Sequence, residues 1–329
     1  MWALGAVLAL ALVALVVLVP RFTAREASGP QSGIVGALDE VSVSGRVGAT
    51  PVVALAAPVE VGGVKAKELA TGSGRSITEG SPVLLSLTSF DGDTGDSLST
   101  TGRPRLVVGV ANADTLGADI ASLVIGRTEG SRILAIHPVA RTDGSTRARA
   151  EITVVDVLGT IAYGDENTFG QAGALQVTMT SEGPVIKHDS AVPGGLTVQT
   201  LIEGSGQQVG SDDRVVAQFS VVGWTDGVVR SSTWETGMPE LIDLSSAMKG
   251  LREAIVDRRV GSRLAISIPP DLATGDDTLC VVIDVLGAEP ADSSSGTSGA
   301  GTASSGSASG ADSAASGERA AQSGSGASQ

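Results

Sequence analysis

The residues of this chain that could do chemistry are few and scattered. Ser246-Ala-Met-Lys249 matches Ser-x-x-Lys, which in penicillin-recognising enzymes places a serine nucleophile beside an activating amine. The companion motifs Ser-Asp-Asn and Lys-Thr-Gly do not occur in the sequence, so we interpret the match as the start of a helix. The single cysteine, Cys280, lies in the apolar run Leu279–Ile283 with no histidine near it, which favours a buried thiol over a nucleophile.

Metal ligation is also poorly supported by the residue pattern. His137 and His188 lie in different segments without carboxylates at ligand spacing, and His137 fits a histidine on a strand better than a ligand. Asp91–Asp96 (Asp-Gly-Asp-Thr-Gly-Asp) resembles a calcium loop, but it lacks an acidic ligand before the glycine and has Gly102 at the twelfth position. We interpret it as a hairpin turn, and we expect neither a metal nor a cofactor.

The charge balance restricts the class of partner. The net charge is −14 and the pI is about 4.5. Binding to nucleic acid requires a surface rich in Lys and Arg, which this composition does not provide. We therefore expect no nucleic-acid partner.

The first 20 residues differ in kind from the rest. Trp2–Pro20 is almost entirely Ala, Leu and Val without a charge, and it is long enough to span a bilayer as a helix. No basic residue precedes it, and Phe22-Thr-Ala24 is a poor cleavage site, so we favour an uncleaved anchor over a cleaved secretion signal. Arg21 and Arg25 would favour a cytoplasmic C-terminal side. On the assumption that basic residues lie upstream, we expect the domains at the cell membrane on the extracytoplasmic side; the alternative is secretion after signal cleavage.

An internal repeat organises the rest of the chain. The segment that ends at Gly74 is repeated in the segment that ends at Gly206. The segment that begins at Gly130 is repeated from Gly261, and the one that ends at Gly159 is repeated in the one that ends at Gly287. The repeated segments lie about 130 residues apart, which is the length of one domain. We therefore expect two tandem domains, which we call the first and second copies. The expected boundaries are 1–20 anchor, 21–44 tether, 45–159 first copy, 160–193 connecting segment, 194–288 second copy and 289–329 a Ser/Gly/Ala tail that is disordered.

Each copy has the pattern of a small β-rich domain with one helix. Short Val/Ile/Leu runs alternate with Gly, Pro, Asp and Ser clusters, which indicates strands joined by turns. We expect strands at 83–87, 105–109, 131–138 and 151–158, and at 214–222, 240–244, 263–269 and 278–286. Helical spacing predicts a helix at 113–125, capped by Asp114 or Thr115, and another at 247–256, capped by Ser245 or Ser246.

The second copy resembles the FKBP-type peptidyl-prolyl cis-trans isomerases. The residues that carry the resemblance are Leu201–Gly206, Gly223–Ser232, Arg259–Arg263, Ile268–Gly275 and Thr278–Val285, which fall in the family's order within Leu196–Gly287. Val61–Gly159 resembles the family mainly through its likeness to the second copy. The resemblance implies an α+β fold, in which each copy is a curled antiparallel sheet of five or six strands around one short helix.

The implied activity needs no nucleophile. Rotation about an X–Pro bond has a barrier of about 20 kcal/mol from amide resonance, and no bond is made or broken. A dry apolar pocket that grips proline and favours the twisted amide is sufficient. The implied partners are proline-containing polypeptides.

The resemblance also implies the pocket, and it shows how this chain departs from the family. In the second copy the implied pocket residues are Phe219, Val229, Arg230, Met248, Leu251, Thr274 and Ile283. Val229-Arg230 replaces the family's Phe-Asp, Leu251 its floor Trp, Thr274 its carbonyl-binding Tyr and Ile283 its closing Phe. Glu240 replaces an apolar aromatic residue. In the first copy Leu87 and Ser97–Thr100 stand at the matching positions, and Phe90 is its only aromatic residue.

Three functions follow as alternatives. The first is an isomerase that assists the folding of exported proteins, with weak activity confined to the second copy. The second is a non-catalytic chaperone or protein-binding module at the cell surface. The third is a structural spacer made of two β-rich domains.

Overall fold

The computed structural model describes residues 36–140, 149–167, 175–189 and 191–291, and every structural statement below concerns these residues. The expected anchor at 1–20 and most of the expected tail lie outside them. Within them, no helix is long and apolar enough to cross a membrane. By internal contacts the described residues up to Ala291 form one compact unit.

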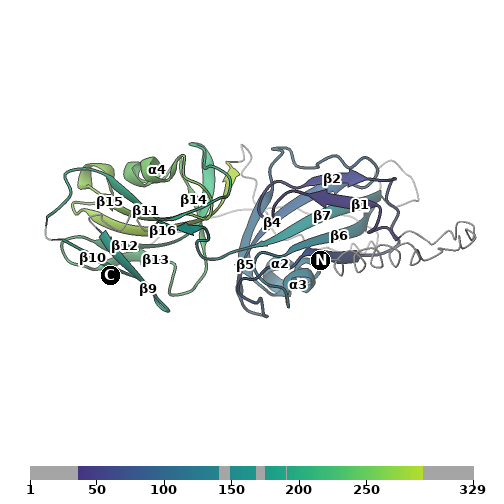
Figure 1. Ribbon diagram of the computed structural model, residues 1–329, viewed down its shortest axis with the longest axis horizontal. Coiled ribbons are helices and arrows are strands. Elements are labelled where there is room, and N and C mark those ends of the chain that lie inside the picture. Colours follow the sequence, from purple (N-terminus) through teal and green to yellow (C-terminus); the bar gives the residue numbers. More distant parts are fainter. Residues whose placement is uncertain (1–35, 141–148, 168–174, 190, 292–329) are drawn as a thin grey trace, which may run out of the picture. The chain divides into compact units, whose positions relative to one another are not determined.

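The described part consists mostly of antiparallel sheets with few helices, as the sequence predicts (Figure 1). In the first copy a five-stranded sheet has the order β3-β6-β7-β4-β5. Its elements are β3 (Lys65–Ala70), β4 (Pro82–Asp91), β5 (Arg105–Val110), α2 (Ala113–Leu116), α3 (Ala118–Val124), β6 (Arg132–Val139) and β7 (Arg149–Leu158), preceded by the hairpin β1 (Val41–Ser44) and β2 (Val52–Leu55).

The sheet of the second copy has seven strands rather than the expected five or six. Its path is β13-β12-β16-β15-β11-β8, with β14 also paired to β12. The elements are β8 (Asp165–Glu166), β11 (Thr197–Glu203), β12 (Asp213–Gly223), β13 (Val229–Ser232), β14 (Glu240–Asp243), α4 (Lys249–Ile255), β15 (Arg263–Ile268), η2 (Pro270–Leu272) and β16 (Leu279–Pro290). The number is higher because the expected connecting segment contributes β8, and because the edge beside β12 is split into β13 and β14.

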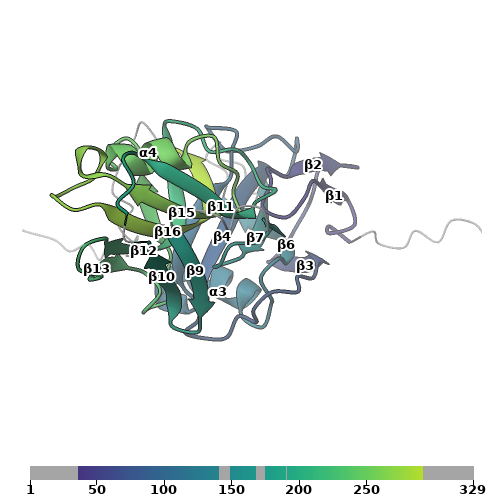
Figure 2. The same ribbon diagram turned by 60° about the vertical axis from the view of Figure 1, so that its left-hand side comes forward.

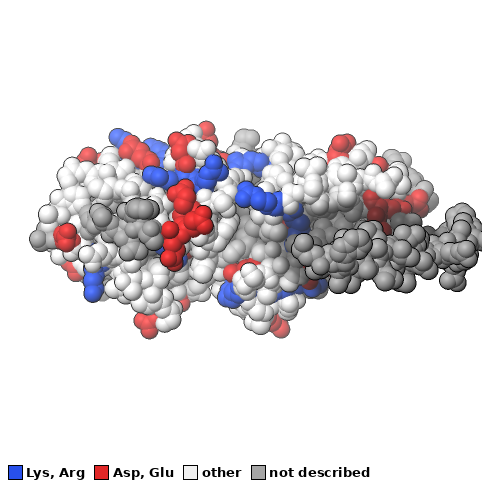
Figure 3. Space-filling view, in the orientation of Figure 1, with Lys and Arg blue, Asp and Glu red and all other residues white. Residues whose placement is uncertain are grey.

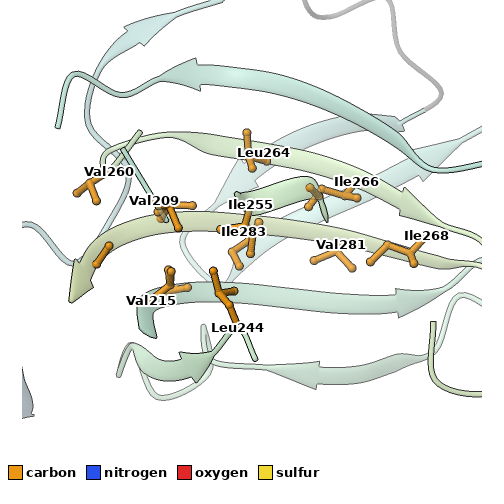
Figure 4. Packing of buried hydrophobic residues seen from close by; sticks show 14 of the residues in the cluster. Val209, Val215, Leu244, Ile255, Val260, Leu264, Ile266, Ile268, Val281 and Ile283 are labelled. Carbon is orange, nitrogen blue, oxygen red and sulfur yellow. The ribbon is translucent and has the colours of Figure 1, made fainter. Parts of the chain in front are cut away.

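The inner face of each sheet packs against its helices. In the first copy alternate residues of β7, Val155 and Val157, join a buried cluster that contains Val124 of α3. In the second copy Ile266 and Ile283 of β15 and β16 meet Ile255 of α4 in the larger cluster drawn in Figure 4. Each fully buried aliphatic side chain of this kind contributes about 1.5–3 kcal/mol to folding.

The outer face of each sheet is covered by a hairpin that the sequence analysis did not predict. Val43, Val53 and Leu55 of β1–β2 pack on a buried cluster that includes Ile152 and Val154 of β7. The hairpin β9 (Leu175–Thr180) and β10 (Gly183–His188) packs in the same way on the second copy, where Leu175 is buried with Trp224, Ala265 and Cys280. Residues assigned to a tether and a connecting segment are thus part of the packed structure. At the other end, β16 continues to Pro290, past the expected start of the tail.

Both expected helix caps are wrong. The helix at 113–125 is divided into α2 and α3 at Gly117, and the N-cap is Asn112, whose side chain accepts a hydrogen bond from the Thr115 amide. α4 begins at Lys249 without a side-chain cap. The hydroxyl of Ser246 instead donates to the Asp243 carbonyl in the preceding turn, so the Ser-x-x-Lys match marks a turn and a helix start.

Candidate substrate pocket

A pocket of about 440 Å³ lies in the second copy between the inner face of the sheet and the segment that leads into α4. The structure places six of the seven predicted site residues around it: Phe219, Arg230, Met248, Leu251, Thr274 and Ile283. Val229 does not line it. Val229 is 54% exposed at the start of β13, beside an irregularity in the pairing with β12.

Strands β12 and β16 supply the floor of the pocket. Phe219 on β12 is paired in register with Ile283 on β16, and Val221 with Val281. Ile283 is fully buried and Val281 nearly so, which gives the pocket an apolar floor (Figure 4). Sequence reasoning missed Val221, Ser231, Ile242, Ala247, Leu279 and Val281 among the lining residues. The period-two alternation of β12 and β16 from Phe219 and Ile283 is the signal that could have found three of them.

The intervening residue Cys280 faces away from the pocket. It is buried in the outer cluster beneath the β9–β10 hairpin. Burial, with a smaller contribution from the charge of Asp277, raises the pKa of this thiol to about 11. The thiol therefore stays protonated at neutral pH and is a core residue, as expected from the sequence.

A close approach of α4 to the sheet positions the opposite wall. A Cβ at Gly250 would lie 2.4 Å from Cγ2 of Ile268, so only glycine permits this distance. Met248 and Leu251 flank Gly250 and are thereby held over the floor. Both are partly buried and pack against the main cluster.

The rim of the pocket carries an ordered group of charges. Nη2 of Arg230 donates a hydrogen bond to the Asp226 carboxylate at 2.8 Å. The same nitrogen lies 3.8 Å from the Asp277 carboxylate. The Thr225 amide and hydroxyl donate to Asp277 at 3.1 and 2.8 Å. A Cβ at Gly223 would lie 2.5 Å from a carboxylate oxygen of Asp226 and 2.6 Å from Nη2 of Arg230, so a larger residue at the end of β12 would displace these two side chains.

Hydrogen bonds keep both rim carboxylates ionised. The Val228 amide, and after it the Arg230 side chain, lowers the pKa of Asp226. The hydroxyl of Thr225, and after it the Thr225 amide, lowers the pKa of Asp277. Arg230 is the only charged residue among the described residues that line the pocket, and its guanidinium is held at the rim by these two anions.

Other residues singled out from the sequence lie outside the pocket. Glu240 is exposed on β14. Trp224 is buried in the outer cluster and stacks on His188 with 4.0 Å between ring centroids, while Trp234 lies 5.9 Å from the guanidinium of Arg263. In the first copy Leu87 packs into the inner cluster with Leu116 and Leu123, and Phe90 faces the opposite side of the sheet.

The residues suggested for metal binding are engaged in other contacts. Asp91 accepts hydrogen bonds from the amides of Asp93 and Thr94, and it forms an ion pair with Arg149 at 3.0 Å. These contacts make 91–96 a turn of the kind expected. His137 lies 3.9 Å from Glu151 on the neighbouring strand. Within the described ranges no group of three His, Cys, Asp or Glu side chains could hold a metal.

Comparison with known proteins finds sequence similarity to a probable FK506-binding protein and to an outer membrane protein. No family model matches it. It is 27% identical over 105 residues to a probable FK506-binding protein of Corynebacterium glutamicum, a match that covers 29% of this chain and 89% of that protein. It is 31% identical over 84 residues to the outer membrane protein MIP of Legionella longbeachae, covering 26% of this chain and 36% of that protein.

Among solved structures, that of the three FKBP domains of wheat FKBP73 is 14% identical and covers 69% of this chain and 95% of the other, with a TM-score of 0.27. The match to the Corynebacterium protein spans almost all of that relative. This sequence similarity supports the resemblance of the chain to the FKBP-type peptidyl-prolyl cis-trans isomerases.

Proposed function

We propose that the second copy is a peptidyl-prolyl cis-trans isomerase of low activity that acts on exported proteins. The observation that supports this most is the pocket itself, which has a buried aliphatic floor, walls from Phe219 and Met248, and an ordered polar rim. Such a pocket can hold a proline ring away from water. In that setting the planar amide, which is more polar than the twisted one, loses the most solvation, and the barrier to rotation falls.

Low activity follows from the side chains that form the pocket. Among the described residues that line it, Phe219 is the only aromatic one. Leu251 and Ile283 are smaller than the rings found at these positions in the family, and each missing ring removes part of the surface that would contact the proline. Thr274 retains a hydroxyl donor for a substrate carbonyl, on a shorter side chain.

We further propose tandem FKBP-like domains with the boundaries 45–159 and 194–288, each supplemented by its upstream hairpin. The relative from Legionella is named an outer membrane protein, which agrees with an extracytoplasmic site of action for this chain. The apolar residues 1–20 would attach the domains to the membrane, or would direct secretion if they are cleaved.

A second candidate function is a non-catalytic chaperone or binding module. The observation that favours it comes from the first copy, where Leu87 and the helix residues Leu116 and Leu123 pack together on the inner face of the sheet. Such a copy could contribute binding without isomerisation.

The test is the cis-to-trans relaxation of a proline-containing tetrapeptide, followed by NMR exchange, with the full chain at rising concentration. Acceleration proportional to the protein concentration supports the isomerase. No acceleration at about 100 μM, together with suppressed aggregation of an unfolded client, would support the chaperone instead.

A further inference from the structure

The mouth of the substrate pocket lies between two parts of the second copy that are far apart in the sequence. One is the turn that follows β12 together with β13, which lies beside β12 (Figure 2). The other is the segment 269–278, which leads from β15 through η2 to β16. The first part brings Arg230 to the pocket and the second brings Thr274. The contacts between the two parts therefore determine the shape of the mouth.

The beginning of the segment 269–278 is fixed by packing. Leu272 packs against the main cluster, and its Cβ lies 3.2 Å from the Cβ position of Gly250 in α4. The Leu272 amide also donates to the Pro269 carbonyl at 3.0 Å. Beyond Thr274 comes Gly275 with φ +100°, a residue type whose backbone is the least restricted of all. Thr274 is therefore fixed only if a second anchor follows the glycine.

Asp277 provides this second anchor. Its carboxylate accepts hydrogen bonds from the Thr225 amide at 3.1 Å and from the Thr225 hydroxyl at 2.8 Å. The Trp224 amide donates to the Thr278 carbonyl at 2.8 Å. These bonds join the turn that follows β12 to the end of the segment that carries Thr274.

The same carboxylate also faces the cation of the mouth, since it lies 3.8 Å from Nη2 of Arg230. A charge pair alone would not single out Asp277. Exposed ion pairs contribute little, and acidic and basic side chains are interspersed over the face shown in Figure 3. Asp277 differs because a single side chain contacts both Thr225 and Arg230. Its neighbour Asp276 is exposed and takes no part in these contacts.

The first copy separates the scaffold from the side-chain arrangement. There the Gly92 amide donates to the Ala150 carbonyl at 2.9 Å, which matches the backbone bond between Trp224 and Thr278. The position that matches Asp277 is Arg149, which pairs with Asp91 at 3.0 Å. The backbone bond is thus common to both copies, whereas the contact between Asp277 and Thr225 belongs to the copy that has the substrate pocket.

We propose that Asp277 is a positioning residue of the substrate pocket, which holds Thr274 and Arg230 in place on opposite sides of its mouth. This role rests on the proposed isomerase function, in which the Thr274 hydroxyl donates to a substrate carbonyl. Asp277 and Thr225 are not among the described residues that line the pocket, so they act through the segment 273–277. Without their hydrogen bonds this segment samples more conformations, and the Thr274 hydroxyl meets the carbonyl in a smaller fraction of molecules.

The test compares two substitutions of Thr225 in the full chain. T225V removes the hydroxyl that donates to Asp277 and keeps the size of the side chain, whereas T225S keeps the hydroxyl. We expect T225V to lower kcat/KM for a proline-containing tetrapeptide about threefold, as for the loss of one exposed hydrogen bond, and T225S to retain most of the parent value. D276N removes the neighbouring exposed carboxylate and serves as the control, with kcat/KM unchanged.

A second measurement distinguishes positioning from a general loss of stability. All rates are measured well below the melting temperature of each variant, where the folded fraction is complete. In the absence of peptide, T225V should shift the NMR signals of the Thr274 amide and methyl groups and lower the heteronuclear NOE at residues 273–277. T225S and D276N should leave these signals close to those of the parent protein.

Two results would overturn the proposal. One is an equal kcat/KM of T225V and T225S, and the other is a set of Thr274 signals that T225V does not change. If the parent protein does not accelerate isomerisation at all, the proposed isomerase function fails. The role of Asp277 is then decided by the Thr274 signals and by the affinity of the same peptide for T225V and T225S, which should differ about threefold.

Discussion

Replacing Phe219 by alanine should lower isomerase activity more than it lowers the stability of the fold. The backbone of Phe219 is fixed independently of its ring, because its amide donates to the Thr233 hydroxyl at 2.8 Å and its carbonyl accepts from the Thr233 amide at 3.0 Å. The ring lines the pocket and packs against the main cluster, where it is partly buried. F219A should therefore remain folded, with a loss of about 2 kcal/mol of stability, below the 3–5 kcal/mol of a fully buried Phe.

The effect on activity can be worked from the contact area. If a bound proline covers about 50 Å² of the ring, the lost contact is worth about 1.3 kcal/mol at about 25 cal/mol per Å², or close to tenfold in kcat/KM. The assay is NMR exchange of a prolyl tetrapeptide, with thermal denaturation in parallel. Leu87, at the matching position of the first copy, provides the control. L87A removes a comparable apolar contact and should lower stability without changing the isomerisation rate.

The result that refutes this reasoning is an equal loss of activity in F219A and L87A. In that case the rate would follow global stability, or the first copy would contribute to catalysis. An unchanged rate in a folded F219A would equally refute the assignment of the pocket. Normal peptide binding with a reduced kcat would instead show that the ring acts on the twisted amide rather than on the ground state.

Four further predictions follow from the packing and charges of the second copy. D284N should destabilise the protein by about 3 kcal/mol, because it leaves Arg263 buried without its anion, and a denaturant titration measures this. Cys280 should resist iodoacetamide at pH 8 in the native protein and react once the chain is unfolded, because burial raises its pKa to about 11. The folded-state pKa of Asp277 lies below its unfolded value, so its contribution to stability is present above about pH 4 and is lost as pH falls through the folded pKa. The difference in melting temperature between D277N and the parent protein should therefore become smaller in acid. A fragment starting at Val192 should melt lower and bind more ANS than one starting at Ile161, because it lacks the β9–β10 hairpin over Trp224 and Cys280.

The strands could be predicted from the sequence because their apolar alternation is strong. The expected strands at 83–87 and 214–222 lie within β4 and β12, and the helix at 247–256 contains α4. The hairpins were missed for a physical reason. Only a few side chains of β9 and β10, among them Leu175 and Ile186, pack against the sheet. The residues between them are mostly polar or exposed, so the segment has the sequence pattern of a linker.

The pocket was predictable in part, and only through the family resemblance. Composition and spacing identified no catalytic group, since prolyl isomerisation requires none. Contacts such as the one between Arg230 and Asp277, or the packing of Gly250 against Ile268, join residues that are far apart in the sequence. They link residues whose neighbours in sequence give no sign of a partner, so a single chain without relatives cannot reveal them.

The conserved parts of the repeat now have a structural explanation that is distinct from isomerase activity. In each copy the arginine of Gly-Ser-Arg, at 130–132 or 261–263, forms a buried ion pair with the shared aspartate, Asp156 or Asp284, and Asp284 follows the floor residue Ile283 on β16. Each Asp also accepts a hydrogen bond at 2.7 Å from a backbone amide of an incoming segment, that of Gly48 in the first copy and that of Ala162 in the second. The motifs common to both copies therefore attach covering segments to the sheet. Such attachment constrains backbone geometry and buried charge, so both copies have the same glycine, arginine and aspartate, although the pocket residue Phe219 and its counterpart Leu87 differ.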